Sequence, residues 1–155
     1  MLPYRIELTD EDAGVTAYAG LPLVVETMRT LGVSEQLDKQ LGIRQRDSGA
    51  TDAHKTEALV LLMTAGGTCL SDIEKLRSDK GLERLLGYEL PSTQVLWTFC
   101  NAFHEDALIE QAQRERGPDQ TAYIPRENAP LQALGRVSVA LAQTVVLRSR
   151  SVSAW

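Results

Sequence analysis

The sequence predicts an all-α protein: an irregular multi-helix domain with a helix-turn-helix-like unit, a short extended N-terminal arm and a frayed C-terminal tail. Apolar residues recur every three or four positions along most of the 155 residues, which is the helical period. Glycines and capping residues divide these stretches into short segments. Only residues 1–16 differ, because Tyr4, Ile6 and Leu8 alternate with polar neighbours and predict an arm.

Two helices are expected after the arm. Pro22 suits the first turn of a helix, and Gly32 is expected to end it. The inward face of this helix should comprise Leu23, Val24, Thr27, Met28 and Leu31. Ser34 is expected to cap a second helix that buries Leu37 and Leu41.

A third helix should be the most buried one. Thr51 or Asp52 is expected to cap it, and the run Ala58–Met63 is apolar on nearly every side. The pair Gly66-Gly67 is expected to end this helix sharply.

Two short helices should follow. Ser71 and Glu74 have the spacing of a capping box, in which the serine accepts from a backbone amide and the glutamate reaches back. Asp79 is expected to cap the next helix, and Gly87 to end it. The apolar residues expected to point inward from that helix are Leu82, Leu85 and Leu86.

Two further helical stretches complete the pattern. Ser92 is a good N-cap for a helix that runs to about Phe103, with a bend or break before Asp106. The inward residues of this helix should be Val95, Leu96, Phe99 and Phe103. Asn128 and Pro130 are expected to begin the last helix. Its expected stripe comprises Leu131, Leu134, Val137 or Ser138, Leu141 and Val145.

Composition argues for a soluble cytoplasmic protein and gives no general attraction to nucleic acid. The net charge is −5, and residues 1–53 carry 9 Asp and Glu against 5 Lys and Arg. Cys69 and Cys100 are the only cysteines, and they form no disulfide framework. The N-terminus lacks the apolar core of a signal peptide, and no membrane partner is expected.

The residue pattern suggests no catalytic site. His54 and His104 are the only histidines, too few for a zinc site with fixed ligand spacing. No nucleophile elbow, phosphate-binding glycine loop or dinucleotide motif is present. Taken alone, the chain is predicted to be non-catalytic, with no metal ligands and no cofactor.

A DNA-binding site is the alternative that the pattern supports. Two helices joined by a short glycine-containing turn, Leu82–Gly87 and Ser92–Phe103, are typical of a helix-turn-helix unit. Basic residues upstream would contact phosphates, and the N-terminal and exposed residues of the second helix would contact DNA. The expected phosphate contacts are Lys75, Arg77, Lys80 and Arg84, and the second-helix contacts are Ser92, Thr93, Gln94, Trp97, Thr98 and Asn101. An ordinary helical bundle has similar helix pairs, and Trp97 would equally suit a protein partner or the core.

One block of the sequence resembles a known family. The segment Gly66–Leu82, followed by Leu85-Leu86-Gly87 and Leu90-Pro91-Ser92, is similar to the N-terminal region of bacterial insertion-sequence transposases, in the group described as transposase DDE domain group 1. Leu8-Thr9-Asp10 and the stretch Phe99–His104 resemble the same family. The resemblance covers the chain to about Val139.

The resemblance implies a helical region that contacts the ends of the element and precedes a ribonuclease-H-like core. In that core an Asp, Asp and Glu triad holds two divalent metal ions such as Mg²⁺. No triad residue can be carried over, because the chain after Asn128 runs through Val145 to Trp155 without a carboxylate. A truncated, inactive fragment with an out-of-frame tail is therefore expected.

Four parts and one function follow as expectations. The parts are an arm at 1–16, a DNA-binding-like helical domain at 17–117, a linker and helix at 118–147 and a disordered tail at 148–155. The expected function is binding of insertion-sequence end DNA in the bacterial cytoplasm, associated with the nucleoid when bound. The alternatives are a helical interaction module that pairs with itself or inhibits full-length transposase, and a remnant without function.

Overall fold

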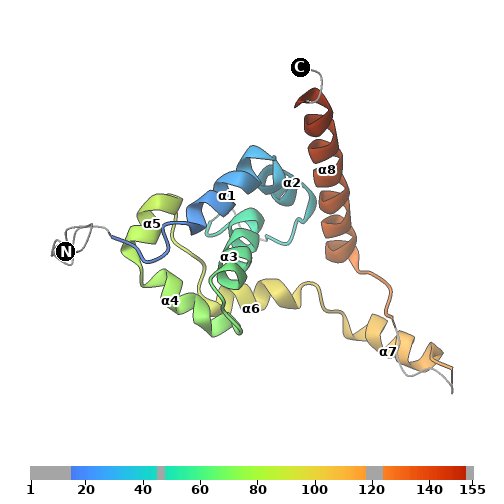
Figure 1. Cartoon of the computed structure of the whole chain (residues 1–155). Helices are drawn as coiled ribbons and strands as arrows, with labels where there is room; N and C mark the ends of the chain where they lie inside the picture. Colours follow the sequence, from blue (N-terminus) through green and yellow to red (C-terminus); the bar gives the residue numbers. More distant parts are fainter. Residues whose placement is uncertain (1–14, 45–47, 118–123, 153–155) are drawn as a thin grey trace, which may run out of the picture.

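The computed structural model describes residues 15–44, 48–117 and 124–152 (Figure 1). Within these residues the protein is all-helical, as the sequence predicts, with no strand. The predicted arm lies almost wholly outside the described residues. The elements are α1 (Leu21–Thr30), α2 (Val33–Gln40), α3 (Asp52–Thr64), the 3-10 turn η1 (Leu70–Asp72), α4 (Ile73–Arg77), α5 (Lys80–Leu86), α6 (Thr93–Asn101), α7 (Asp106–Glu115) and α8 (Ala129–Val152).

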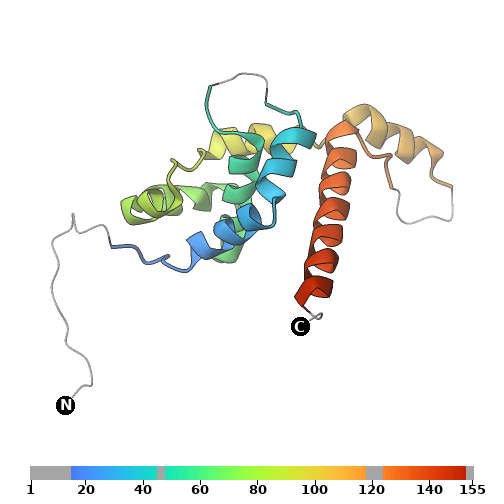
Figure 2. The ribbon, with the colours of Figure 1, turned by 90° about the horizontal axis from the view of Figure 1, so that it is seen from above.

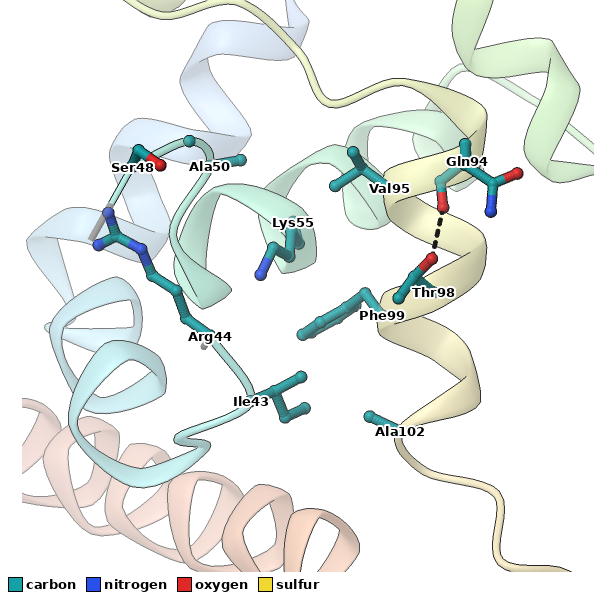
Figure 3. Close-up of a pocket in the computed structure, with 11 residues that line it drawn as sticks. Ile43, Arg44, Ser48, Ala50, Lys55, Gln94, Val95, Thr98, Phe99 and Ala102 are labelled. Atoms are coloured by element: carbon teal, nitrogen blue, oxygen red, sulfur yellow. Dashed lines mark hydrogen bonds between the residues drawn. The ribbon is translucent and has the colours of Figure 1, made fainter. Parts of the chain in front are cut away.

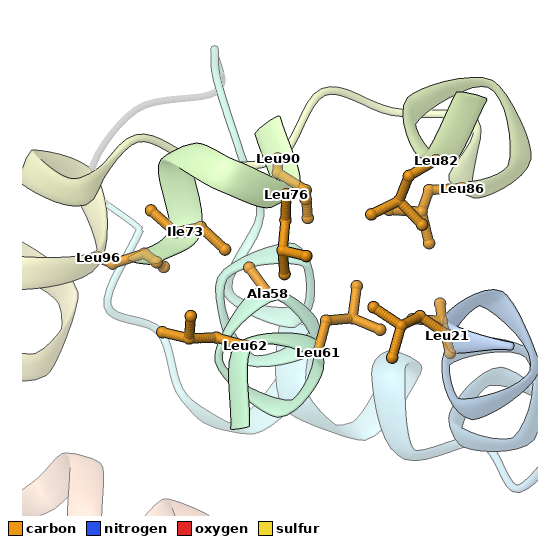
Figure 4. Close-up of a cluster of buried hydrophobic side chains, with 11 residues drawn as sticks. Leu21, Ala58, Leu61, Leu62, Ile73, Leu76, Leu82, Leu86, Leu90 and Leu96 are labelled. Carbon is orange, nitrogen blue, oxygen red and sulfur yellow. The ribbon is translucent and has the colours of Figure 1, made fainter. Parts of the chain in front are cut away.

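Helix α3 is the centre of the fold, as its apolar run predicts. Ala58 and Leu61 are fully buried, and side chains from α1, α4, α5 and α6 surround them (Figure 4). Burial of such leucine-rich surface is the main stabilising contribution in a core without many aromatic residues. The buried members of this cluster are Leu21, Val25, Ala58, Leu61, Leu62, Ile73, Leu76, Leu82, Leu86, Leu90 and Leu96.

A second, smaller core joins α8 to the body. It packs Ala133 and Val137 of α8 with Leu37 of α2 and Phe99 of α6. Helix α7 extends away from the body, and α8 returns to lie beside α2 (Figures 1 and 2). The chain therefore has a body formed by α1 to α6 and a long helix attached to it along one side.

Most predicted helix starts are confirmed by backbone-to-side-chain hydrogen bonds. Thr51, Asp79 and Ser92 accept from the third residue after them, His54, Leu82 and Val95 respectively. Asn128 does the same for α8 by accepting from the Leu131 amide at 3.1 Å. The predicted stop after α5 is also confirmed, since Gly87 has φ of 78°, a conformation that favours glycine.

Two predicted caps are wrong. Ser34 lies inside α2, which begins after Gly32, and its hydroxyl donates to Glu57 at 2.6 Å instead. Ser71 does not cap α4. Instead, Asp72 accepts from the Thr68 and Cys69 amides at 3.0 and 3.3 Å, at the start of the 3-10 turn η1 that precedes α4. Glu74, the expected partner of Ser71, reaches across to α6.

The predicted inward faces are correct in part. Helix α1 buries Leu21 and Val25, whereas Leu23 of the predicted face is 70% exposed and Met28 of that face is half-buried against the second core. Leu85 and Val95 are also exposed, although Leu82, Leu86, Leu96 and Phe99 are buried as predicted. A periodic pattern gives the spacing of an inward face, but the neighbours decide which of two apolar faces is covered.

Helix α8 continues further than expected. It extends to Val152, so residues 148–152, predicted to be a disordered tail, are helical. No glycine or proline follows Gly135, so the sequence contains no helix-breaking residue near 147, where the helix was expected to end. Residues 153–155 lie outside the described part of the chain.

Helix α8 is also apolar. By length and composition alone, its segment Ala129–Leu147 could cross a membrane. Arg136 in the middle of that segment donates from Nε to the side chain of Gln40 in α2 at 2.9 Å, and Val137 is buried in the second core. These contacts attach the helix to the body of the protein.

Candidate nucleic-acid interface

Helix α6 is held in place on one side and open to solvent on the other. Leu96 and Phe99 anchor it in the two cores, and Ser92 caps its first turn. Its outward side carries exposed Gln94, Trp97, Thr98 and Asn101, as the predicted helix-turn-helix unit requires. Trp97 is 54% exposed, so it faces outward and does not belong to the core. None of the nine residues of α6 is charged.

In the predicted helix-turn-helix unit, α5 is the helix that precedes α6. Helix α5 packs against α1 and α4, whereas α6 packs against α3 and η1. The turn between them contains Leu90, which is buried in the first core. The two helices therefore have different neighbouring helices and are connected through the buried turn and the first core.

Thr93 is tied to α4. Its amide and its hydroxyl both donate to Oε1 of Glu74, at 3.1 and 2.9 Å. The bond from the Thr93 amide, with further bonds from Arg77 and the Thr93 hydroxyl, lowers the pKa of Glu74 below its usual value. Glu74 thus acts as an additional cap for α6, and Thr93 and Ser92 position the helix.

The hydroxyl of Thr98 is also occupied. It donates to the Gln94 backbone oxygen at 3.0 Å, and Thr98 lines the groove described below (Figure 3). The side-chain amides of Gln94 and Asn101 are the groups on this face with both donors and acceptors. Gln94 and Asn101 are therefore the residues of this face that can select a binding partner by its hydrogen-bond donors and acceptors.

The predicted phosphate-binding residues divide into two kinds. Arg84 is exposed on α5, and Lys75 and Lys80 are exposed and form ion pairs with Asp72 and Glu83 at 2.8 and 2.6 Å. Pairs between exposed side chains contribute about 0–1 kcal/mol, so a phosphate group could replace either carboxylate. These three cations can reach an external anion.

Arg77 serves the fold instead. Its guanidinium donates to the Leu90 backbone oxygen, to Glu74 and to Glu89, at 2.9, 2.6 and 2.9 Å. These bonds raise its pKa, mainly through the hydrogen bond to Glu74. Because two of these bonds go to the turn between α5 and α6 and the third goes to Glu74 of α4, Arg77 joins that turn to α4.

A groove that sequence reasoning missed lies along the side of α6. Its volume is about 480 Å³, and it separates α6 from the segment before α3 (Figure 3). Its walls include Ile43, Arg44, Lys55, Val95, Thr98 and Phe99. Lys55 pairs with Asp52 at 3.0 Å and lies 5.4 Å above the Phe99 ring. The groove thus joins an apolar floor to two cations beside the face of α6.

The far wall of the groove is fixed by Asp52. Its Oδ2 accepts from the backbone amides of Ile43 and Arg44 at 2.8 and 3.1 Å. Asp52 is 2% exposed, and it was expected only as a possible cap. Its spacing from Lys55, three residues on a helix, is the local signal that could have identified this pair.

Metal-binding geometry is not seen in the described residues. No group of three or more His, Cys, Asp or Glu side chains there is placed to hold an ion. His104 contacts Asp106 at 2.8 Å, but both are exposed. No metal ligand is assigned.

The described residues define an all-helical protein in which α6 presents an uncharged surface to solvent, with Arg44 and Lys55 in the groove beside it. Comparisons of the chain with known protein families, with curated proteins and with solved structures found no match. The function is therefore argued from the geometry.

Proposed function

We propose that this chain binds double-stranded DNA through the exposed face of α6, as a region of the kind that precedes the catalytic core in bacterial DDE transposases. The observation that carries the proposal is the composition of that face. It is uncharged, rigidly capped and displays two side-chain amides, Gln94 and Asn101, with Thr98 and Trp97 between them. The resemblance of the Gly66–Leu82 block to insertion-sequence transposases supports the same proposal.

The spacing of the amides suits the major groove. Gln94 and Asn101 are seven residues apart, which is two helical turns and about 10 Å along the axis. That distance corresponds to about three base pairs, and side-chain amides pair with the hydrogen-bonding edge of adenine.

The cations set the expected strength of binding. Lys75 lies on α4, Lys80 and Arg84 lie on α5, and all three are exposed, while Arg44 and Lys55 line the groove beside α6. Each neutralised phosphate contributes about −0.9 to the slope of log K against log salt, so three contacts give a slope of about −3. Binding should therefore be modest and lost at moderate salt, as the net charge of −5 requires.

A fluorescence-anisotropy titration tests the proposal. The probe is a labelled 30-base-pair duplex enriched by the protein from a random pool, titrated between 50 and 200 mM salt. We expect the variant Q94A/N101A to bind this duplex at least tenfold more weakly, since each bidentate base contact contributes about 1–3 kcal/mol. The control Q113A, on α7, should bind like the wild type.

Two results would overturn the proposal. One is the absence of any enriched or bound duplex at 50 mM salt. The other is binding that neither weakens with salt nor responds to the α6 variant. We place the protein in the bacterial cytoplasm, on the nucleoid when it is bound to the ends of an insertion sequence, and we assign it no catalytic residue or cofactor.

A further inference from the structure

One buried side chain joins the end of α6 to the beginning of α8. Asn128 is 8% exposed, and both polar atoms of its side-chain amide are bonded. Its Nδ2 donates to the Ala102 backbone oxygen at 3.1 Å, and its Oδ1 accepts from the Leu131 amide at 3.1 Å. Asn128 therefore closes the end of one helix and caps the start of another, which lie close together although they are far apart in the sequence (Figures 1 and 2).

The bond to Ala102 satisfies a group that the helix itself leaves open. Ala102 is the C-cap of α6, and the last carbonyl groups of a helix have no partner within it. The Asn101 carbonyl accepts from the His104 amide at 3.0 Å, and the next carbonyl, that of Ala102, accepts from Asn128. The turn that Asn128 closes thus carries Asn101, one of the two side-chain amides on the exposed face of α6.

Apolar contacts link the same two helices. Phe99 of α6 belongs to the second core together with Ala133 and Val137 of α8, and Phe103 packs against this core. The rings of Phe99 and Phe103 meet edge to face, with centroids 5.3 Å apart. Among the described side chains of α8, only Ala133 and Val137 lie in the buried core. Few buried side chains therefore hold α8 on the body, and the polar link at its start adds to them.

The other end of α6 is fixed by a different part of the chain. Glu74 of α4 accepts from the Thr93 amide and hydroxyl at 3.1 and 2.9 Å. Gln94 belongs to this first turn, and Asn101 belongs to the last one. The orientation of Asn101 relative to Gln94 depends on the last turn staying helical, since helix ends fray when their carbonyls lack partners. That last turn is the one that Asn128 closes.

We propose that Asn128 is a positioning residue for DNA binding, through which the attachment of α8 and the binding of DNA by α6 favour each other. This inference rests on the proposed function. Asn128 is buried and acts through the last turn of α6. Because Asn128 orders a turn that binds DNA, DNA must in return strengthen the attachment of α8 by thermodynamic linkage. Residues 124–147, expected to lie outside the DNA-binding domain, are then part of the DNA-binding unit.

Asn128→Asp breaks the link to α6 and keeps the cap of α8. Its carboxylate still accepts from the Leu131 amide, and Asp is as favourable an N-cap as Asn, but it has no donor for the Ala102 carbonyl. Asn128→Ser also keeps a capping oxygen and adds no charge, so it serves as the second variant if the first does not fold. The matched control is Gln132→Glu, the same change of amide to carboxylate at an exposed side chain whose bond, to the Glu127 backbone oxygen at 3.0 Å, is local.

Hydrogen exchange of the free full chain, followed by NMR, tests the link without DNA. We expect the amides of Ala102 and His104 to exchange about tenfold faster in Asn128→Asp and in Asn128→Ser, the effect of losing one buried hydrogen bond. The amides of α3 should keep their wild-type rates, and Gln132→Glu should match the wild type throughout. Wild-type rates at Ala102 and His104 in both Asn128 variants would overturn the proposal.

The enriched 30-base-pair duplex tests the positioning role. Asn128→Asp should bind it about tenfold more weakly with an unchanged salt slope, because no phosphate contact is lost. Gln132→Glu, which adds the same charge, should bind like the wild type. Saturating duplex should slow exchange at Ala133 and Val137 in the wild type and not in Asn128→Asp. The amide shifts of α8 should stay the same, because its attached position is already the main one.

Two results would overturn the positioning role while leaving DNA binding intact. One is an Asn128→Asp variant that binds the duplex as tightly as the wild type. The other is bound duplex that leaves the exchange rates of α8 unchanged in the wild type. A wild-type chain that binds no duplex would instead overturn the proposed function together with this role, and the exchange rates of the free protein would still show whether Asn128 joins α6 to α8.

Discussion

Glu57 joins three helices, α1, α2 and α3, and the turn after α5 through one buried carboxylate. It is 1% exposed and accepts from the Ser34 hydroxyl, the Tyr88 hydroxyl and the Arg29 guanidinium at 2.6, 2.9 and 3.4 Å. Burial, and then the charge of Glu57, raises the pKa of Tyr88, so the phenol stays protonated and donates. The His54 ring stacks on Tyr88 with centroids 4.0 Å apart. A buried charge is tolerated here because both of its oxygens are satisfied.

Replacing Glu57 should therefore be costly. Glu57→Ala leaves two hydroxyl donors without an acceptor and should lower the free energy of unfolding by about 3 kcal/mol in urea denaturation. Glu26→Ala, which removes an exposed carboxylate from α1, should change it by less than about 0.5 kcal/mol. Equal effects of the two substitutions would contradict the stabilising role assigned to the buried Glu57 carboxylate.

Gly67 is required for a close contact rather than for its backbone conformation. A Cβ at this position would lie 2.4 Å from Cδ1 of Leu62, a buried residue of the first core. Gly67→Ala should lower the free energy of unfolding by about 1–3 kcal/mol, because Leu62 must move within a packed core. Gly20→Ala, where a Cβ meets nothing within 4 Å, is the control and should be nearly neutral. A neutral Gly67→Ala in thermal denaturation would contradict the contact.

At the scale of elements, the sequence predicts helix ends better than helix contacts. Caps such as Thr51, Asp79 and Ser92 were predictable because the bond spans three residues. The exposed face of α6 was predictable from its period. The role of Arg77 was not, since two of its partners, Glu89 and the Leu90 backbone, are 12 and 13 residues away. The groove beside α6 was missed for the same reason, because its walls come from separate segments.

Arg77 and Arg84 should separate stability from DNA binding. Arg77→Ala removes two hydrogen bonds to the turn before α6 and one to Glu74 of α4, and it should lower the free energy of unfolding by about 1–3 kcal/mol. Arg84→Ala should leave stability within about 0.5 kcal/mol and reduce the salt slope of DNA binding by about 1. Urea denaturation and the anisotropy titration measure the two effects. The opposite pattern, with Arg84 stabilising and Arg77 neutral, would refute the assignment.

The turn before α4 should make stability depend on acid. The ion-paired bond from Lys75, and then backbone bonds from Thr68 and Cys69, hold the pKa of Asp72 well below its usual value. A folded pKa below the unfolded value of about 3.9 means that the stabilisation is complete above that pH and is lost as pH falls towards the folded pKa. Asp72→Asn should therefore be less stable than wild type at pH 7, with the difference shrinking between pH 5 and pH 2. Thermal midpoints measured across this range should converge, and a constant gap would contradict the linkage.

At the scale of the whole molecule, the distribution of charge and apolar surface matters more than their totals. The net charge of −5 argues against nucleic acid, yet α6 is uncharged and three exposed cations lie on α4 and α5. The all-α class was predictable from periodicity alone. The position of α8 was not, because two apolar stripes on one helix do not show which of them meets the body.

The most direct test of DNA binding through α6 is an amide chemical-shift titration of the ¹⁵N-labelled full chain with the enriched 30-base-pair duplex at 50 mM salt. We predict shift changes at Gln94, Trp97, Thr98 and Asn101, with smaller changes around Arg84, while α7 and α8 stay unchanged. Shift changes that avoid α6, or no changes at a saturating amount of duplex, would contradict the account.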